Sequence, residues 1–206
     1  MILEALCVGP FQVNCYILAA EADSAAILID PGADEKKIRR VLAKHRLKPA
    51  FIVNTHGHID HIADDDKFGV PIYIHRQDAA LLKNPELNLS NFLMSSQSVN
   101  SKVEILEDKQ KIELGAIRME VIHTPGHTPG GICLLLEKPE NKILFTGDTL
   151  FCQGVGRTDF SYGNEKQLIN SIKDKLMKLP PETVIYPGHG PSSTIGEEKK
   201  ANPFLS

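Results

Sequence analysis

Tryptophan is absent from this sequence of 206 residues, aromatic side chains make up only 6% of it, and cysteine occurs four times. The cysteines lie far apart and form no C-x-x-C pair, which argues against both a disulfide scaffold and a zinc ribbon. Reduced thiols are typical of the cytoplasm, so we expect a cytoplasmic protein.

Long apolar runs and blocks of like charge are also missing. No run approaches the roughly 18 apolar residues of a membrane-spanning helix, and the N-terminus lacks the basic and apolar regions of a signal peptide. The 23 basic and 26 acidic side chains give a net charge of −3, and neither sign is concentrated. These absences argue against membrane and nucleic-acid partners and favour a small-molecule substrate.

The composition is that of an ordinary globular protein, with 42% apolar and 24% charged residues. A length of 206 residues fits one large domain or two small ones, at about 100–200 residues per domain. No linker rich in proline, glycine or serine divides the sequence. We therefore predict a single domain over residues 1–206.

Short apolar runs rich in β-branched residues predict strands at 15–18, 26–29, 51–53, 70–74, 117–122, 132–136, 143–145 and 184–186. Apolar residues spaced three and four apart predict helices at 38–45 and 168–176. The early strands follow one another without long helices, whereas the later ones alternate with helices. This order favours an α/β fold with mixed sheets over a pure sandwich or a pure parallel sheet.

A polar, serine-rich stretch at residues 84–108 separates two of the expected strands. It is either a mobile loop beside a functional site or an ordinary surface connection, because long loops are uncommon but not always functional.

Three histidines and an aspartate lie within six consecutive positions, directly after the expected strand 51–53. They are His56, His58, Asp60 and His61. Gly57 allows a sharp turn, so the four side chains can converge on one point. They could instead cap backbone groups, but such tightly packed hydrophilic groups are electrostatically unfavourable without a cation. Neutral imidazoles and an ionised carboxylate are the forms that bind a divalent metal at pH 7. We therefore predict a metal site here.

Three further candidate ligands, His127, Asp148 and His189, each lie in a glycine-containing turn that follows an expected strand. This repeated pattern predicts that their loops reach the same edge of the sheets as the first cluster. Five histidines and two aspartates exceed what one tetrahedral metal needs and suit two metals with a bridging carboxylate.

These seven residues, in this order, resemble the ligand motif of the metallo-β-lactamase superfamily. The resemblance implies an αββα sandwich, in which two mixed β-sheets are flanked by helices, and it extends from Asp30 to residue 204. Residues 146–151, TGDTLF, and 187–191, PGHGP, are most similar to the glyoxalase II (hydroxyacylglutathione hydrolase) branch, particularly its short bacterial members.

The resemblance implies a role for each candidate residue. One metal is held by His56, His58 and His127, and the other by Asp60, His61 and His189, with Asp148 as the bridge. Asp60 and Asp148 are the expected catalytic residues, and Asp30 is expected to accept hydrogen bonds behind the ligands or simply to form a turn. Arg157 is expected to bind the glutathione moiety, or else to form a surface salt bridge. Zinc is the favoured metal, and iron and manganese also suit these ligands.

The implied reaction is the hydrolysis of a thioester such as S-lactoylglutathione by hydroxide generated at the two metals. Only residues 190–206 follow His189, so we expect no C-terminal helical domain of the kind that helps long glyoxalase II enzymes to hold glutathione. Pro191 and Asp159 also stand where those enzymes carry aromatic residues. Weak selectivity for glutathione is therefore expected.

Two alternatives remain open. An iron-dependent persulfide dioxygenase shares the His/Asp framework, and residues 156–160, GRTDF, resemble that branch equally well. A non-catalytic, metal-stabilised binding module is the other. Superfamily nucleases fit less well because they usually carry a further domain, and β-lactamases because their histidine pattern is expected to differ.

Overall fold

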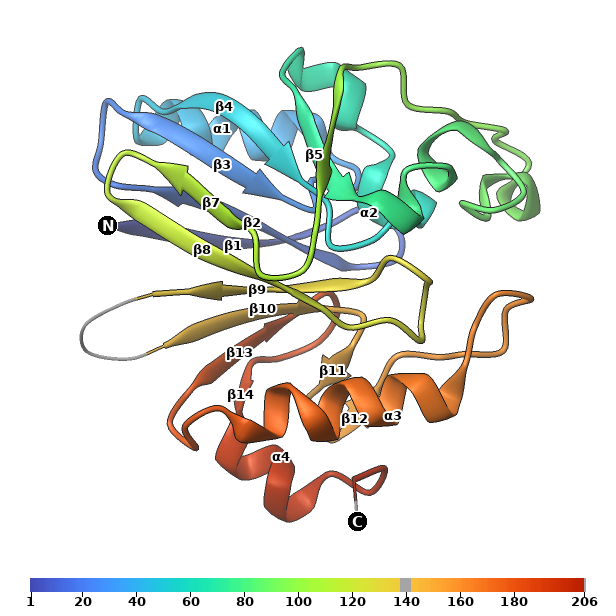
Figure 1. Cartoon of the computed structure of the whole chain (residues 1–206). Coiled ribbons are helices and arrows are strands. Elements are labelled where there is room, and N and C mark those ends of the chain that lie inside the picture. The colour runs from blue at the N-terminus through green and yellow to red at the C-terminus, as the bar shows by residue number, and fades with distance from the viewer. Residues whose placement is uncertain (138–141, 206) are drawn as a thin grey trace.

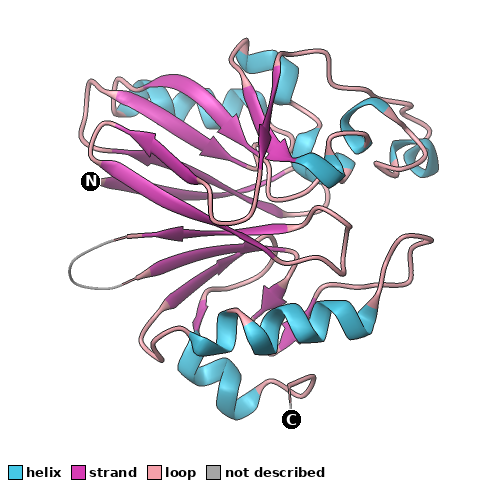
Figure 2. Cartoon of the chain, viewed as in Figure 1, coloured by secondary structure: helices cyan, strands magenta, loops and turns pink. Residues whose placement is uncertain are grey.

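Two six-stranded β-sheets stack face to face in the computed structural model, which describes residues 1–137 and 142–205 (Figures 1 and 2). The first sheet contains, in spatial order, β1 (Ile2–Val8), β2 (Val13–Ala19), β3 (Ala25–Ile29), β4 (Lys48–Val53), β5 (Ile72–His75) and β6 (Val103–Leu106). The second contains β14 (Ser193–Thr194), β13 (Val184–Pro187), β10 (Ile143–Gly147), β9 (Ile132–Leu136), β8 (Ile117–His123) and β7 (Lys111–Leu114). A hairpin of β11 (Leu150–Phe151) and β12 (Gly154–Val155) lies beside the second sheet.

The α-helices are α1 (Glu35–Lys44), α2 (Ile59–Ile62), α3 (Glu165–Asp174) and α4 (Ile195–Ala201) within the described residues. Short 3₁₀ helices are η1 (Asp65–Phe68), η2 (Arg76–Asp78), η3 (Leu81–Lys83), η4 (Ser90–Leu93) and η5 (Leu176–Lys178).

Three apolar cores define four layers. Ile38 and Leu42 of α1 pack against the outer face of the first sheet. A second core, which includes Ile29 and Phe145, fills the space between the two sheets. A third core joins the outer face of the second sheet to Leu168 of α3 and to α4. This is the αββα arrangement that the family resemblance implies, in which each helix buries one apolar face against a sheet.

Both sheets are mixed, as predicted. Strands β1 to β3 pair antiparallel and β3 to β6 parallel, while in the second sheet only β10 and β13 pair parallel. The order of helices and strands differs from the expected one, because α1 separates β3 from β4 and the described residues from β7 to β9 contain no helix. The expected strand 70–74 begins only at Ile72, since Pro71 has no N–H to donate to a ladder.

The polar stretch 84–108 holds η4 and β6 rather than a continuous loop. Strands β6 and β7 were missed because VEIL and KIEL are short and alternate charged with apolar residues, as half-buried edge strands do.

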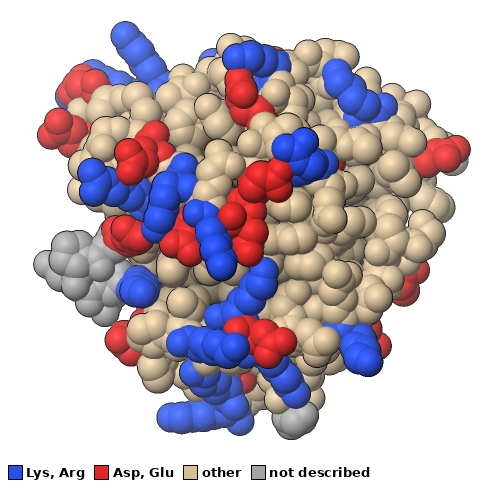
Figure 3. Space-filling view, in the orientation of Figure 1, with Lys and Arg blue, Asp and Glu red and all other residues tan. Residues whose placement is uncertain are grey.

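The surface carries both signs of charge. On the face drawn in Figure 3, basic and acidic side chains are interspersed and concentrate toward the left, and the right half is mostly uncharged. No helix within the described ranges is long and apolar enough to cross a membrane.

Two histidines stack where the ends of the sheets meet. The rings of His75, at the end of β5, and His123, at the end of β8, lie 4.0 Å apart at 14°. His123 Nε2 is 2.9 Å from Pro129 O, in the loop that also carries His127. Burial, together with the charge of His123, lowers the pKa of His75 to about 4, although Glu107 and Asp108 oppose the shift.

This shift predicts a pH dependence of stability. A lowered folded-state pKa means that the unfolded chain binds the proton more tightly, so stability is complete above about pH 6.5 and falls as the pH drops toward 4. We expect His75→Gln to lessen that fall by about 2–3 kcal/mol, measured as the free energy of unfolding of both proteins in urea. Parallel pH profiles of the two proteins would contradict the assignment.

Candidate metal centre

Four loops at one end of the two sheets carry the predicted ligands. The loop after β4 supplies His56, His58, Asp60 and His61, the last two from α2. The loops after β8, β10 and β13 supply His127, Asp148 and His189. The structure therefore brings all seven residues together, because strands from both sheets end on the same side (Figure 1).

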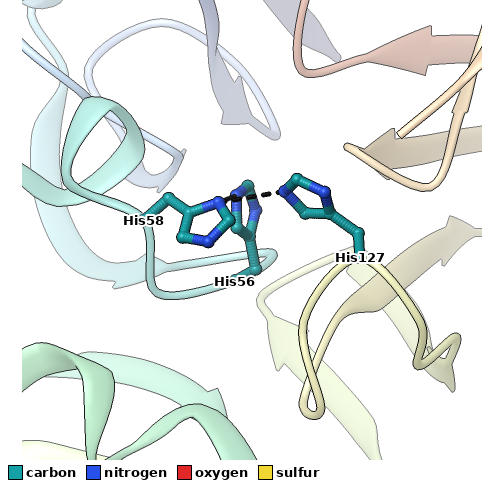
Figure 4. A group of neighbouring side chains, drawn as sticks. All are labelled: His56, His58 and His127. Carbon is teal, nitrogen blue, oxygen red and sulfur yellow. Dashed lines mark hydrogen bonds between the residues drawn. The ribbon is translucent and has the colours of Figure 1, made fainter. Parts of the chain in front are cut away.

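Three buried imidazoles face one point (Figure 4). His58 Nδ1 lies 3.1 Å from His56 Nε2 and 3.0 Å from His127 Nε2. Gly57, between the first two, lets the loop lie close against η3, since a Cβ there would lie 2.5 Å from Leu81 Cβ. One proton on His58 Nδ1 could serve only one of these contacts well, whereas a single cation would satisfy all three nitrogens.

A second group contains Asp60, His61 and His189. His189 Nε2 lies 3.3 Å from Asp60 Oδ2, and His61 Nε2 lies 3.8 Å from the same oxygen. These three side chains come from two different loops, so the site exists only in the folded chain.

Asp148 reaches both groups. Its Oδ1 lies 3.5 Å from His61 Nε2, and its Oδ2 lies 3.6 Å from His189 Nε2 and 3.7 Å from His127 Nε2. Gly188 leaves room for this carboxylate, because a Cβ there would lie 2.2 Å from Asp148 Oδ1. The arrangement is that of a binuclear His/Asp site with a shared carboxylate.

Two of these polar atoms are buried without a hydrogen-bond partner, namely His61 Nε2 and Asp148 Oδ1. Leaving such an atom unsatisfied costs about 1–3 kcal/mol, more for a charged group. The two atoms lie 3.5 Å apart within one group of candidate ligands, so the residues fit divalent cations that accept nitrogen and carboxylate ligands.

Asp30 holds the ligand loop from behind. Its Oδ1 accepts from Thr55 N at 2.7 Å, and its Oδ2 accepts from Thr55 Oγ1 at 2.6 Å and lies 3.0 Å from His61 Nδ1. The contact leaves His61 Nε2 facing the site, in the way that metal-bound histidines are oriented. The structure thus places Asp30 as the expected acceptor as well as at a turn.

The electrostatics of the two groups differ. Burial, and then the neighbouring imidazoles, lower the pKa of His56 and His58, so these rings are neutral at pH 7. Burial also opposes the charged form of His61, but Asp60, Asp148 and Asp30 outweigh it and raise the pKa to about 10. The carboxylates therefore stabilise positive charge at this position, and bound cations would supply it.

Arg157 lies in an exposed ion pair. Its Nε and Nη2 donate to Asp159 at 2.7 and 2.6 Å, and its guanidinium lies 4.8 Å from the ring centre of Phe160. Arg157 thus forms a surface salt bridge, which is one of the two roles that the sequence analysis considered. The other role, binding of glutathione by Arg157, stays a prediction. Phe160 packs against the rings of His58 and His127 at 4.9 and 5.6 Å and was not singled out from the sequence.

Asp78 is a second residue that sequence reasoning missed. Its carboxylate accepts from Gly57 N at 3.1 Å, Thr128 Oγ1 at 2.7 Å and Gly130 N at 2.6 Å. It thereby joins the two loops that carry the three-histidine group. No local pattern marks this aspartate, because its partners come from distant parts of the chain.

Asp78→Asn is expected to lower the free energy of unfolding by about 1–3 kcal/mol, since the new amide would turn an N–H group toward one of the three donors. Burial raises the pKa of Asp78 to about 6, so burial of the charged carboxylate offsets part of what its three hydrogen bonds contribute, and a measurement at pH 8, where it is ionised, gives the net effect. Urea unfolding of the variant, compared with Asp174→Asn on the exposed end of α3, tests it. Equal midpoints for the two variants would refute the role of Asp78.

Known proteins are similar to this chain in sequence and in fold. The model of the metallo-beta-lactamase superfamily matches residues 8–189. Hydroxyacylglutathione hydrolase GloC of Haemophilus influenzae is 37% identical over 219 residues, covering 100% of this chain and 99% of that protein.

Two crystal structures are also similar. The BLEG-1 B3 metallo-beta-lactamase has 36% identity and a TM-score of 0.91, with 100% of both chains covered. TTHA1623 in a di-iron-bound form has 33% identity and a TM-score of 0.81, covering 98% of this chain and 100% of that one. Since the family model spans most of the chain and the fold and ligand geometry agree with it, the chain belongs to the metallo-β-lactamase superfamily.

Proposed function

We propose that this protein is a metal-dependent hydrolase that cleaves thioesters such as S-lactoylglutathione. The observation that carries the proposal is Asp148, whose two oxygens lie 3.5 to 3.7 Å from ligand nitrogens of both groups. A carboxylate so placed suits a pair of metals rather than one. The relative named hydroxyacylglutathione hydrolase, 37% identical over its whole length, supports the thioester as substrate class.

The proposed ligands are His56, His58 and His127 for one ion and Asp60, His61 and His189 for the other, with Asp148 shared. Two bound divalent ions would supply Lewis acidity and a water of lowered pKa at neutral pH. The ligand types suit zinc best and leave iron and manganese possible, and the similar TTHA1623 structure holds two irons.

The chain's own residues prepare this chemistry. Asp30 and Asp78 fix the two ligand loops through hydrogen bonds, so little reorganisation is needed when a substrate arrives. Phe160 covers one side of the three-histidine group and keeps bulk water from it. The right-hand half of the face in Figure 3, on the side where the ligand loops lie in Figure 1, carries few charges, which suits a substrate with an uncharged acyl group. The four free cysteines agree with the reducing, cytoplasmic environment expected from the sequence.

Substrate range is expected to be broad. Because Arg157 is paired with Asp159, little free positive charge on this loop is available for the carboxylates of glutathione. We expect S-lactoylglutathione and thioesters of small uncharged thiols to differ in kcat/KM by less than about tenfold, or about 1.4 kcal/mol. Arg157→Ala would leave the Asp159 carboxylate unpaired, so it should lower kcat/KM for the negatively charged acyl-glutathione more than for the uncharged thioester. A preference for acyl-glutathione of about a thousandfold would contradict this expectation.

The hydrolase and the persulfide dioxygenase are separated by metal content and oxygen uptake. Two metals per chain with thiol release and no oxygen uptake would support the hydrolase. One iron per chain, with oxygen consumed on addition of glutathione persulfide and no thioester cleavage, would replace it with the dioxygenase. Stable metal binding without turnover of any of these compounds would indicate the binding module.

β-Lactam hydrolysis is a second candidate because of the similarity to BLEG-1, which is described as a B3 metallo-beta-lactamase. The expectation that β-lactamases differ in their histidine pattern stays a prediction. A chromogenic β-lactam assayed beside the thioester decides which substrate has the larger kcat/KM.

A further inference from the structure

The hydroxyl of Tyr162 lies between a metal-ligand histidine and a distant segment of the chain. Tyr162 Oη is 2.8 Å from His58 Nε2 and donates to Leu87 O at 2.7 Å. Its ring stacks on Phe160, with centres 5.8 Å apart.

These contacts fix the proton on His58. The phenolic hydrogen is directed to Leu87 O, so Oη accepts from His58, and Nε2 of that ring must carry hydrogen. A neutral imidazole has one donor and one acceptor. The unprotonated atom is then Nδ1, which faces His56 Nε2 and His127 Nε2 at 3.1 and 3.0 Å.

We propose that Tyr162 is a positioning residue that fixes the tautomer and ring orientation of His58 for cation binding, and that it connects the three-histidine group to residues 84–101. The proposal rests on the proposed metal site and is independent of which substrate is cleaved.

The segment 84–101 forms hydrogen bonds with residues beside His58 and is therefore expected to become more ordered when a cation binds there. Besides the bond from Tyr162, it accepts from Ile59 N at Asn88 O, at 2.9 Å, directly beside the ligand loop. Asn88 is buried and its side chain bonds both Gln97 O and Ser90 N at 2.9 Å, which closes the base of the segment. Its tip instead exposes three consecutive apolar side chains, Phe92, Leu93 and Met94. Two hydrogen bonds thus link the segment to the surroundings of His58. One comes from Tyr162, which contacts the His58 ring, and the other from Ile59, the residue that follows His58.

The test is Tyr162→Phe, which keeps the ring and removes the hydroxyl. Zinc affinity is measured by competition with a chromophoric chelator. We expect the wild type to bind two zinc ions and the variant to bind one of them about 10–100-fold more weakly, with the other unchanged. Tyr73→Phe is the matched control, since the ring of Tyr73, on β5 of the first sheet, contacts that of Phe51 with centres 4.8 Å apart.

Two further measurements separate this role from a general loss of stability. Proton–nitrogen NMR of the imidazoles should show a slowly exchanging Nε2 hydrogen on His58 in the wild type and in Tyr73→Phe, and rapid exchange in Tyr162→Phe. Zinc should slow amide exchange in residues 88–97 of the wild type and less so in Tyr162→Phe.

Equal zinc affinities and equal exchange in the wild type and Tyr162→Phe would overturn the inference and leave the proposed metal site intact. A wild type that binds no zinc, iron or manganese would overturn both.

Discussion

Replacement of Asp148 by asparagine is expected to lower thioester turnover by about a thousandfold or more, equal to about 4 kcal/mol of lost transition-state stabilisation, while the fold stays intact. The amide keeps the shape of the side chain and removes its negative charge. Asp148 lies within 3.7 Å of nitrogens from His61, His127 and His189, so its charge acts on both ligand groups at once. Steady-state kinetics at saturating zinc measure the loss.

The control for this prediction is Asp174→Asn, the same chemical change at an exposed position on α3. It should keep full activity, and circular dichroism should show the same fold for both variants. If Asp148→Asn retained activity within a few-fold of the wild type at full metal occupancy, Asp148 would not be a bridging ligand.

Removal of the metals is expected to lower the melting temperature by at least about 10 °C. A ligand present at 1,000 times its Kd stabilises the folded state by about 4 kcal/mol, and two such ions by about twice that. In a chain of this size 1 kcal/mol corresponds to about 2–4 °C. The loss arises because the buried His61 Nε2 and Asp148 Oδ1 have no hydrogen-bond partner when no cation is bound.

Calorimetry before and after dialysis against a chelator measures this shift. A sample with zinc in excess over the chelator serves as the control and should melt like the untreated protein. An unchanged melting temperature after elemental analysis confirms complete removal would show that the cluster is stable without metal.

The sequence by itself determined the buried strands and the set of candidate ligands. Continuous runs such as ICLLL and ILFTG are buried on both faces, and burial of this kind leaves a signal within a few residues. Four ligands lie within six positions, and the other three lie in glycine-containing turns that follow strands, so they too could be found locally. The superfamily resemblance followed from those residues and was confirmed.

Only the tertiary structure decided how the sheets are assembled and which side chains support the ligands. Edge strands β6 and β7 have weak patterns because one side of each lacks a neighbouring strand. Asp78 and Tyr162 look like ordinary polar residues in sequence, since their partners lie far along the chain at Gly130, His58 and Leu87. Local patterns record burial and turns, whereas hydrogen bonds between loops depend on which strands become neighbours, and that is fixed only when the two sheets stack.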